Sequence, residues 1–476
     1  MTAVTTPEYG HQHGPQFGQQ GPQHVPDPNA PTGAPAPYGY PTNQFPQSPY
    51  PHSTPVTQPG IVPQQPEPEN KGRKRGIVVG LVIALVLALG GGATWWVLSE
   101  RASVASGASS PEEAAERLLT AVGNGDLLGA AQSLAPGEAS VLGDQLQEAF
   151  TEFRRLGMLS QDADPAAFSG ITFTAENLQF DPAAAERIND RVTVAKLTGG
   201  TFTLDADLTK LPLAPEYRDA LVAAAQADGK PTAEKASVDV ATLVKQTGSP
   251  IRIATVNVDG EWYPSLFYTV ADLALGDAGM DWPSTSIPAR GADSPTDAVR
   301  DLVQAALDAD VQRVIELLPP DEMGVAHDVG PLLVQAAKLK GARPSGVRIL
   351  DLQTENSDVT GGTLATITAL EVDMQGQGRF SFSKNGDCYR VEMAGQSKQL
   401  CGADLAAAVV ANADSGTSPE TLERITGVLA AQGVGLVTTE VDGKHYVSPL
   451  RTVGDLGMRL YRELTPEDFK AMLEFN

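Results

Sequence analysis

Two segments decide the fold because each begins one copy of a repeated unit: PEEAAERLLTAVGNGDLLGAAQSLAPGE, from Pro111, and PTDAVRDLVQAALDADVQRVIELLPPDE, from Pro295. They align without a gap at an offset of 184 residues. The identical positions are Pro111 and Pro295, Ala114 and Ala298, Leu118 and Leu302, Ala121 and Ala305, Asp126 and Asp310, Leu134 and Leu318, Pro136 and Pro320, and Glu138 and Glu322. VDGEWYPSLFYTVADL, from Val258, resembles VDGKHYVSPLRTVGDL, from Val441, at an offset of 183. Two matches at nearly one offset predict a tandem duplication.

Each copy is predicted to open with three helices. Ser110 and Ser294 are the expected N-caps of the first helix, each followed by proline, with an acidic residue three positions after the cap. Apolar residues then recur at helical spacing. Asp126 and Asp310 are expected to cap a short second helix. A third helix is predicted over residues 138–156 in the first copy and 324–339 in the second.

Strands follow the helices in both copies. Alternation of apolar residues predicts strands around 171–175 and 192–204, and further strands at 347–352, 363–372 and 378–384. Hairpin turns are expected at Asn385-Gly386, Asp259-Gly260 and Asp442-Gly443. Additional helices are predicted at the positions 213–227, 403–413 and 418–431. Helices followed by an antiparallel sheet make an α+β layer fold.

The opening SPEEAAERLLTAVGNGDLLGAAQSL resembles the start of nuclear transport factor 2-like domains, and VDGEWY is similar to their terminal hairpin. The resemblance implies two tandem cone-like domains, with helices packed on a bent antiparallel sheet and a pocket between them. We assign the first repeat to residues 110–281, a Pro/Gly/Ser-rich linker to 282–293, and the second repeat to 294–476. The middle of each repeat departs from the family pattern. The family contains both enzymes and binding or scaffold modules, so the fold does not choose the function.

Residues 76–99, GIVVGLVIALVLALGGGATWWVLS, carry no charge and are long enough to span a bilayer as a helix. Four basic residues lie within 71–75, which predicts a cytoplasmic N-terminus and extracytoplasmic repeats. A cleaved signal peptide is the competing interpretation, but the apolar region and the leader are too long for one. Small residues recur at every fourth position and predict either self-association of this helix or the ordinary composition of membrane helices. They are Gly76, Gly80, Ala84, Ala88 and Gly92.

Residues 1–75 contain 17 of the 36 prolines and few aliphatic residues, which predicts a disordered cytoplasmic tail. This tail is either a solvated spacer or a segment that recruits a cytoplasmic partner. Residues 100–109 are expected to be a short stalk. The net charge of −24 belongs entirely to the part beyond the apolar segment, where 30 basic residues face 54 acidic ones. Such a surface repels nucleic acid, so no nucleic-acid partner is expected.

The chain has two cysteines, Cys388 and Cys401, both extracytoplasmic by this topology. They are predicted to form one disulfide. We expect it to join the hairpin at Asn385-Gly386 to a helix that begins near Ala403. A metal site is the alternative, but suitable ligands are not nearby in the sequence.

Catalytic motifs are not evident: the sequence has no nucleophile elbow, phosphate loop, dinucleotide-binding glycine pattern or zinc-binding helix motif. His327 and His445 are the two histidines beyond the membrane segment. His445 could be a general base if it lined a pocket, but it takes the place of Trp262, which favours a packing or hairpin-surface role. Tyr263 and Tyr446 are also expected to pack. No cofactor or metal is predicted.

The leading hypothesis is a non-enzymatic, single-pass membrane protein of a bacterial cell envelope that binds envelope proteins or a small apolar ligand. The alternative is an extracytoplasmic enzyme of the same superfamily, acting on a small molecule or lipid. A receptor that signals through a recruited partner is a third possibility. Converging Asp, His and Tyr in the cone interior would favour catalysis, whereas apolar filling would favour binding or scaffolding.

Overall fold

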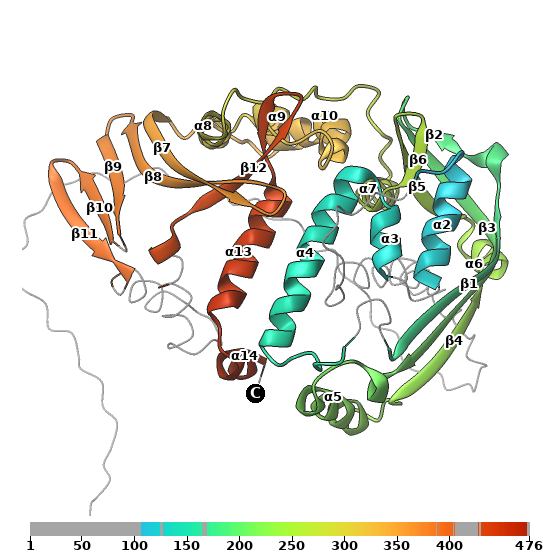
Figure 1. Ribbon diagram of the computed structural model, residues 1–476. Coiled ribbons are helices and arrows are strands. Elements are labelled where there is room, and N and C mark those ends of the chain that lie inside the picture. The colour runs from blue at the N-terminus through green and yellow to red at the C-terminus, as the bar shows by residue number, and fades with distance from the viewer. Residues whose placement is uncertain are drawn as a thin grey trace, which may run out of the picture. The chain divides into compact units, whose positions relative to one another are not determined.

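A computed structural model describes residues 106–123, 127–163, 169–386, 388–402, 404, 427 and 430–473 (Figure 1). This part of the chain is mixed α+β with two curled antiparallel sheets, which confirms the predicted class. The tail, the apolar segment 76–99 and its five small residues lie outside the described residues. None of the helices in the described ranges combines the length and the apolar character that a bilayer crossing requires.

The first repeat begins with three helices, then alternates strands with helices, and ends in a helix. Its helices are α2 (Pro111–Gly123), α3 (Leu127–Ser133), α4 (Pro136–Arg155), α5 (Pro215–Ala227), α6 (Val240–Thr247) and α7 (Leu266–Ala278). Its strands are β1 (Ile171–Phe180), β2 (Glu186–Arg187), β3 (Val192–Asp207), β4 (Ala233–Asp239), β5 (Ile251–Val258) and β6 (Glu261–Pro264). Short 3-10 turns lie at Pro182–Ala184 and Leu208–Lys210.

The second repeat starts in the same order. Its described helices are α8 (Pro295–Leu307), α9 (Val311–Glu316), α10 (Gly324–Leu339), α13 (Pro449–Glu463) and α14 (Pro466–Leu473). Its strands are β7 (Val347–Val359), β8 (Gly362–Met374), β9 (Gly378–Asn385), β10 (Cys388–Met393), β11 (Gln396–Cys401), β12 (Gly435–Val441) and β13 (Lys444–Val447). The helices predicted at 403–413 and 418–431 fall almost entirely outside the described residues.

The caps and turns follow the sequence signals. The hydroxyls of Ser110 and Ser294 accept the backbone N–H three residues later, at 3.2 and 3.1 Å. Asp310 caps α9 in the same way, at 3.0 Å, whereas Asp126 lies outside the described residues. In the turns at 259–260 and 442–443 both the Asp and the Gly have positive φ, as two-residue hairpins between twisted strands require.

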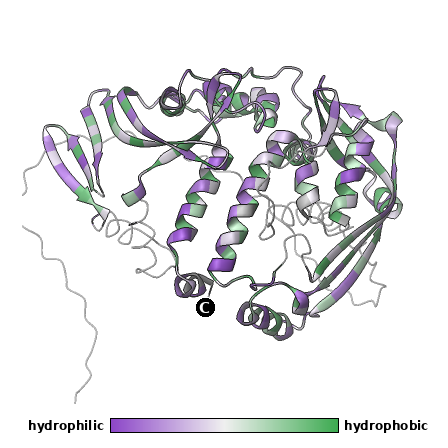
Figure 2. Cartoon of the chain, in the orientation of Figure 1, coloured by the Kyte–Doolittle hydropathy of each residue, from purple (hydrophilic) through white to green (hydrophobic). Residues whose placement is uncertain are grey.

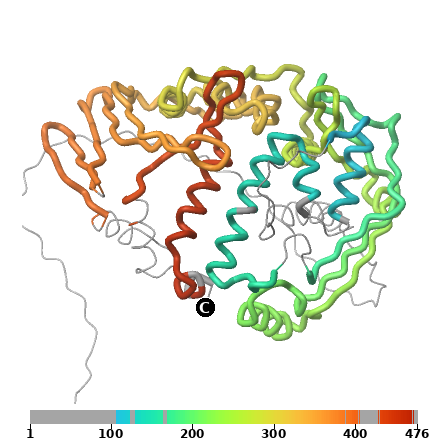
Figure 3. The backbone as a smooth tube through the Cα atoms, viewed as in Figure 1, coloured from blue at the N-terminus to red at the C-terminus, as the bar shows by residue number. Residues whose placement is uncertain are grey.

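Strand β3 is the centre of the first sheet. Its first half pairs with β5, and its second half lies between β1 and β4 (Figure 3). The pairing partners of β3 change at Gly200, where φ is +128° and an added Cβ would lie 3.1 Å from the carbonyl oxygen of Glu176. The pairing with β1 shifts register over the same segment. A glycine is therefore needed where the sheet curls.

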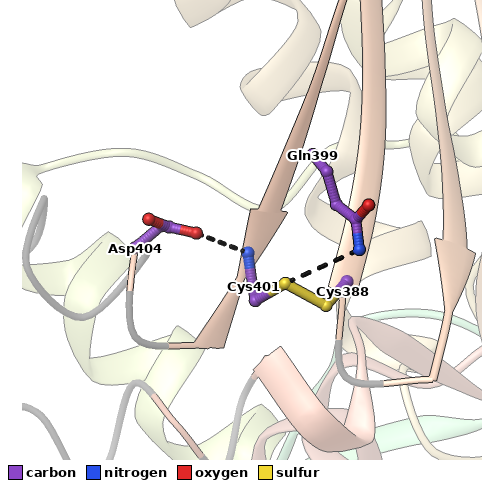
Figure 4. The surroundings of a disulfide bond; sticks show 4 residues. All are labelled: Cys388, Gln399, Cys401 and Asp404. Atoms are coloured by element: carbon purple, nitrogen blue, oxygen red, sulfur yellow. Dashed lines mark hydrogen bonds between the residues drawn. A yellow bond between two sulfur atoms is a disulfide. The ribbon is translucent and has the colours of Figure 1, made fainter.

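The second sheet has the strand order β11-β10-β9-β8-β12-β13, with β7 on the other edge of β8. The hairpin predicted at Asn385-Gly386 joins β9 to β10, but the prediction for the disulfide was wrong in one respect. Cys401 lies at the end of β11, directly opposite Cys388 on β10, so the disulfide joins two neighbouring strands rather than a hairpin and a helix (Figure 4). The turn at Ala394-Gly395, where both residues have positive φ, is the signal that the sequence analysis missed.

The segments predicted as stalk and linker also make ordered contacts. Ala108 is buried and pairs with Trp262 on β6, and Ala292 pairs in the same way with His445 on β13. An added Cβ on Gly107 would clash with the ring of Tyr263, and one on Gly291 with the ring of Tyr446. Each first helix is therefore preceded by a Gly-Ala pair that packs on the terminal hairpin of its own repeat.

Reduction of the disulfide should loosen β10 and β11 selectively. In the chain-entropy model, a closed loop of this length contributes roughly 3 kcal/mol, which corresponds to about a 100-fold change in local opening. We expect the backbone amides of β10 and β11 to exchange with deuterium faster after reduction, up to that factor, as measured by mass spectrometry. The amides of β3 and β5 are the internal control. Equal acceleration in both sheets would contradict a local role.

Candidate functional site: the junction between the repeats

The carboxylate of Glu138, in the first turn of α4, caps the last helix of its own repeat. It accepts the backbone N–H of Leu266 at 2.7 Å and the hydroxyl of Ser265, whose oxygen in turn accepts the N–H of Tyr268 at 3.1 Å. Glu138 is almost fully buried. Burial raises its pKa to about 7, although these hydrogen bonds favour the charged form.

Glu322, the corresponding residue of the second repeat, makes the same contact with its serine, but the next residue is Pro449, which has no N–H to donate. Glu322 accepts the hydroxyl of Ser448 at 2.5 Å, and Ser448 accepts the N–H of Arg451 at 3.2 Å. Glu322 also pairs with the side chain of Arg451 through Nε at 2.5 Å. Burial raises the pKa of Glu322, and the charge of Arg451 opposes this shift.

The helix that follows the terminal hairpin of each repeat, α7 or α13, reaches the third helix of the other repeat. Arg451 on α13 donates to Asp144 on α4 at 2.8 Å, and Tyr268 on α7 donates to Asp328 on α10 at 2.6 Å. These are equal positions of the two repeats, since Asp144 and Asp328 differ by 184 and Tyr268 and Arg451 by 183. Residue i contacts j, and the copy of j contacts the copy of i, as in an isologous dimer. We call this region the junction.

Gly137 and Asp321 are also equal positions, and they meet each other at the junction. A Cβ added to Gly137 would lie 2.1 Å from the backbone oxygen of Asp321. The contact of a residue with its own copy places these two positions at a local pseudo-two-fold axis. Only glycine leaves room for the approach of the two backbones.

Helices α4 and α13 continue the contact beyond the charged group, and both alternate hydrophilic and hydrophobic segments (Figure 2). Gln145 donates to the backbone oxygen of Leu450 at 2.6 Å, and Arg155 donates to that of Leu464 at 3.0 Å. Arg462 pairs with Glu148 at 3.0 Å. The rings of Phe153 and Tyr461 also meet edge to face.

The two reciprocal contacts differ in chemistry. Arg451 is buried and neutralises two carboxylates, those of Glu322 and Asp144. Asp328, equally buried, is held mainly by uncharged donors: Tyr268, Asn189 at 2.9 Å, and the hydroxyl of Ser286. Burial and the neighbouring Asp328 raise the pKa of Tyr268, so its hydroxyl remains a donor at neutral pH.

Three cavities adjoin the junction. One of about 360 Å³ lies beside Gly137 and Asp321 and is walled by Tyr268, Phe267 and Val256, among others. A second, of about 420 Å³, lies between the turn at 189–191, the segment 286–289 and α10. A third, of about 350 Å³, is bounded by α4, α13 and the turn between β7 and β8.

The structure does not bring the histidines and tyrosines from the sequence analysis into one site. The ring nitrogens of buried His327 face the backbone oxygens of Ile287 and Leu318, at 2.9 and 3.0 Å. His445 lies on the terminal hairpin, opposite Glu440. Tyr263 and Tyr446 are buried, as predicted. Within the described ranges, no group of three His, Cys, Asp or Glu side chains is arranged to hold a metal ion.

The junction itself was missed by the sequence analysis. Glu138 and Glu322 were aligned as equal positions, but no role was given to them, and α7 and α13 were not predicted. The signal was present: in both copies a serine follows the terminal hairpin, and a threonine stands four residues later. Thr269 and Thr452 donate to the backbone oxygens of Ser265 and Ser448, at 2.6 and 2.7 Å.

No protein-family model, curated protein or solved structure matches the chain. The proposed function therefore depends on the geometry of the junction and on the filling of the two repeats.

The buried carboxyl of Glu138 should make stability depend on pH. Its pKa rises from an ordinary 4.5 to about 7 on folding, so the folded state binds the proton more tightly. Stability should therefore fall as the pH rises from about 4.5 to 7, by about 3 kcal/mol. The raised pKa of Glu322 gives a slope of the same sign. We therefore expect Glu138→Gln to make the slope shallower by about this amount in urea denaturation curves of the full-length protein between pH 5 and 8. A slope as steep in the variant as in the wild type would exclude Glu138 as a source.

The two reciprocal contacts should differ in strength. Arg451→Met leaves the carboxylate of Glu322 buried without its cationic partner, which costs about 3–5 kcal/mol. Tyr268→Phe removes one hydrogen bond from Asp328, which keeps two other donors, so we expect a loss of about 1–2 kcal/mol. Chemical denaturation of the full-length variants at pH 7.5 measures both. Equal losses would show that the charge of Arg451 adds nothing to the junction.

Proposed function

We propose that this chain is a membrane-anchored binding or scaffold protein of a bacterial cell envelope. Its extracytoplasmic part would consist of two tandem cone-like domains that resemble nuclear transport factor 2-like domains. Residues 76–99 would be the single membrane span, with a Pro-rich tail in the cytoplasm. The two α+β halves of the described chain, each opening with three helices, support the tandem arrangement.

The observation that carries this proposal is the filling of the space between helices and sheet. In the first repeat, the helix residues Ala115 and Leu119 pack against Leu197 and Phe202 of β3. In the second repeat, Ala298 and Val299 of α8 pack against strand residues that include Leu352. Apolar, closely packed side chains favour a binding or scaffold module over a catalytic cone.

Glu138 is the residue whose pKa of about 7 would suit general acid–base chemistry. Its two carboxylate oxygens are, however, engaged by Ser265 and Leu266 at the start of α7. A carboxylate that holds a helix in place is committed to the fold, so its pKa is better explained by burial than by catalysis. The junction therefore supports a structural role in fixing the two repeats against each other.

The disulfide supports an extracytoplasmic location for the second repeat. Cys388 and Cys401 are bonded to each other, and no free cysteine is present in the described part of the chain. Disulfides persist in oxidising compartments and are rare in the cytoplasm. This agrees with the orientation predicted from the basic residues before the apolar segment.

Protease treatment of intact spheroplasts should test the proposal. We expect fragments of the repeats to be released from the outside, while an epitope tag placed before residue 75 stays protected until the membrane is lysed. Immunoblots against both ends follow the two parts. Protection of both ends, or release of the whole chain without detergent, would contradict a single-pass anchor.

A further inference from the structure

Arg191 stands in a wall that two of the junction cavities share. The cavities of about 360 and 420 Å³ have Arg191, Pro320 and Gly324 in common. The backbone of Arg191 is fixed on both sides: its N–H donates to the side-chain oxygen of Asn189 at 2.9 Å, and its carbonyl oxygen accepts the N–H of Asn257 at 2.7 Å. The base of this side chain is therefore held in place before any ligand arrives.

The guanidinium of Arg191 has unused donors. It makes no hydrogen bond to any described residue, and its one ion pair, to Asp328, is long at 3.8 Å. Asp328 does not need it, because Tyr268, Asn189 and Ser286 already donate to both carboxylate oxygens. A guanidinium carries five N–H donors in a planar fork that matches carboxylate and phosphate groups. The side chain is 53% exposed, so a ligand can reach it.

The beginning of α10 adds to the same wall. Met323 offers no side-chain cap, and the backbone N–H groups of Gly324 and Val325 have no acceptor among the described residues. A Cβ on Gly324 would lie 3.2 Å from the hydroxyl of Tyr268 and 3.9 Å from Nη2 of Arg191. Glycine thus keeps a space open between the guanidinium and the positive end of the helix dipole.

The walls on either side are mainly apolar. The 360 Å³ cavity is lined by Val256, Val258, Phe267 and Val325, and the 420 Å³ cavity by Ile287 and two prolines. Carboxylates also line both cavities: Glu138, Asp259, Asp321 and Glu322 the first, and Asp190 and Asp328 the second. Glu138, Glu322 and Asp328 are already bonded to donors, Asp321 accepts the N–H of Glu322, and Asp190 pairs with Arg187. The shared wall thus combines unused cationic and N–H donors with apolar surface, in a protein whose exterior is otherwise strongly acidic.

We propose that this cleft binds a small amphiphilic anion, with its carboxylate or phosphate group on Arg191 and its apolar part against Val256, Val258 and Phe267. The proposal rests on the proposed binding role of the repeats, which it extends to a ligand class. The two can fail separately, because a protein scaffold without this ligand would give the same membrane topology.

Isothermal titration of the full-length protein in nanodiscs tests the proposal. The probes are hexanoate and hexyl phosphate, compared with acetate and inorganic phosphate, which lack the apolar part, and with hexylamine, which has the opposite charge. We expect the hexyl anions to bind at least about tenfold more tightly than the short anions and hexylamine. The preference between the two hexyl anions identifies the headgroup. Equal binding of inorganic phosphate or of hexylamine would overturn the proposal.

Arg191→Met should weaken binding of the preferred hexyl anion at least about tenfold. Arg191→Lys, which keeps the charge but loses the planar fork, should fall between this variant and the wild type. Arg379→Met is the matched control: Arg379 is exposed, pairs with Glu371 on the second sheet, and neither residue lines either cavity, so the affinity should change less than twofold. Unchanged affinity in Arg191→Met, with an unchanged thermal unfolding temperature, would overturn the site.

Discussion

The arrangement of the two repeats depends on one interaction that occurs twice: a buried glutamate at the start of the third helix holds the serine that caps the helix after the terminal hairpin. Glu138 and Ser265, and likewise Glu322 and Ser448, place α7 and α13 so that the next turn of each faces the other repeat. Each carboxylate lies near a helix N-terminus and is favoured by the helix dipole, and Glu138 also accepts the N–H of Leu266, which has no partner inside the helix. Both effects compensate part of the cost of burying the charge.

The two halves of the junction have diverged where the repeats meet. Arg451 couples its own Glu322 to Asp144 of the other repeat, so the capping carboxylate and the cross-repeat contact form one charged group. In the first repeat, Tyr268 leaves Glu138 without a cation and reaches Asp328 by a hydroxyl. Burial is the largest influence on the pKa of both glutamates, but only at Glu322 does the charge of an arginine oppose it. Asp328 is held by uncharged donors, so the guanidinium of the nearby Arg191 is not needed to bind it.

Much of the fold was predictable because local signals determined it. The serine caps at 110 and 294 and the Asp-Gly turns at 259 and 442 each depend on residues within four positions, and the structure confirms them. The contact of Arg451 with Asp144 joins residues 307 positions apart, and nothing in the local pattern indicates it. The alignment of the two repeats did contain a sign of this contact, since Asp144 and Asp328 are identical residues at equal positions. We interpreted such identical residues as evidence of a common origin, although at the junction they also make equivalent contacts.

Two repeats in one chain permit a junction that a symmetric dimer of the second repeat could not form. At a two-fold axis a residue must meet its own copy. Here the backbone of Asp321 approaches Gly137 so closely that a side chain at 137 would clash. Two copies of the second repeat would place Asp321 against itself, with a clash and two like charges. Because both repeats lie in one chain, each could change alone: glycine on one side gives the space, and the other side keeps a carboxylate. The same freedom allowed arginine at 451 and tyrosine at 268, so the asymmetry that gives Asp328 uncharged donors and Asp144 a charged one follows from the linkage of the two repeats.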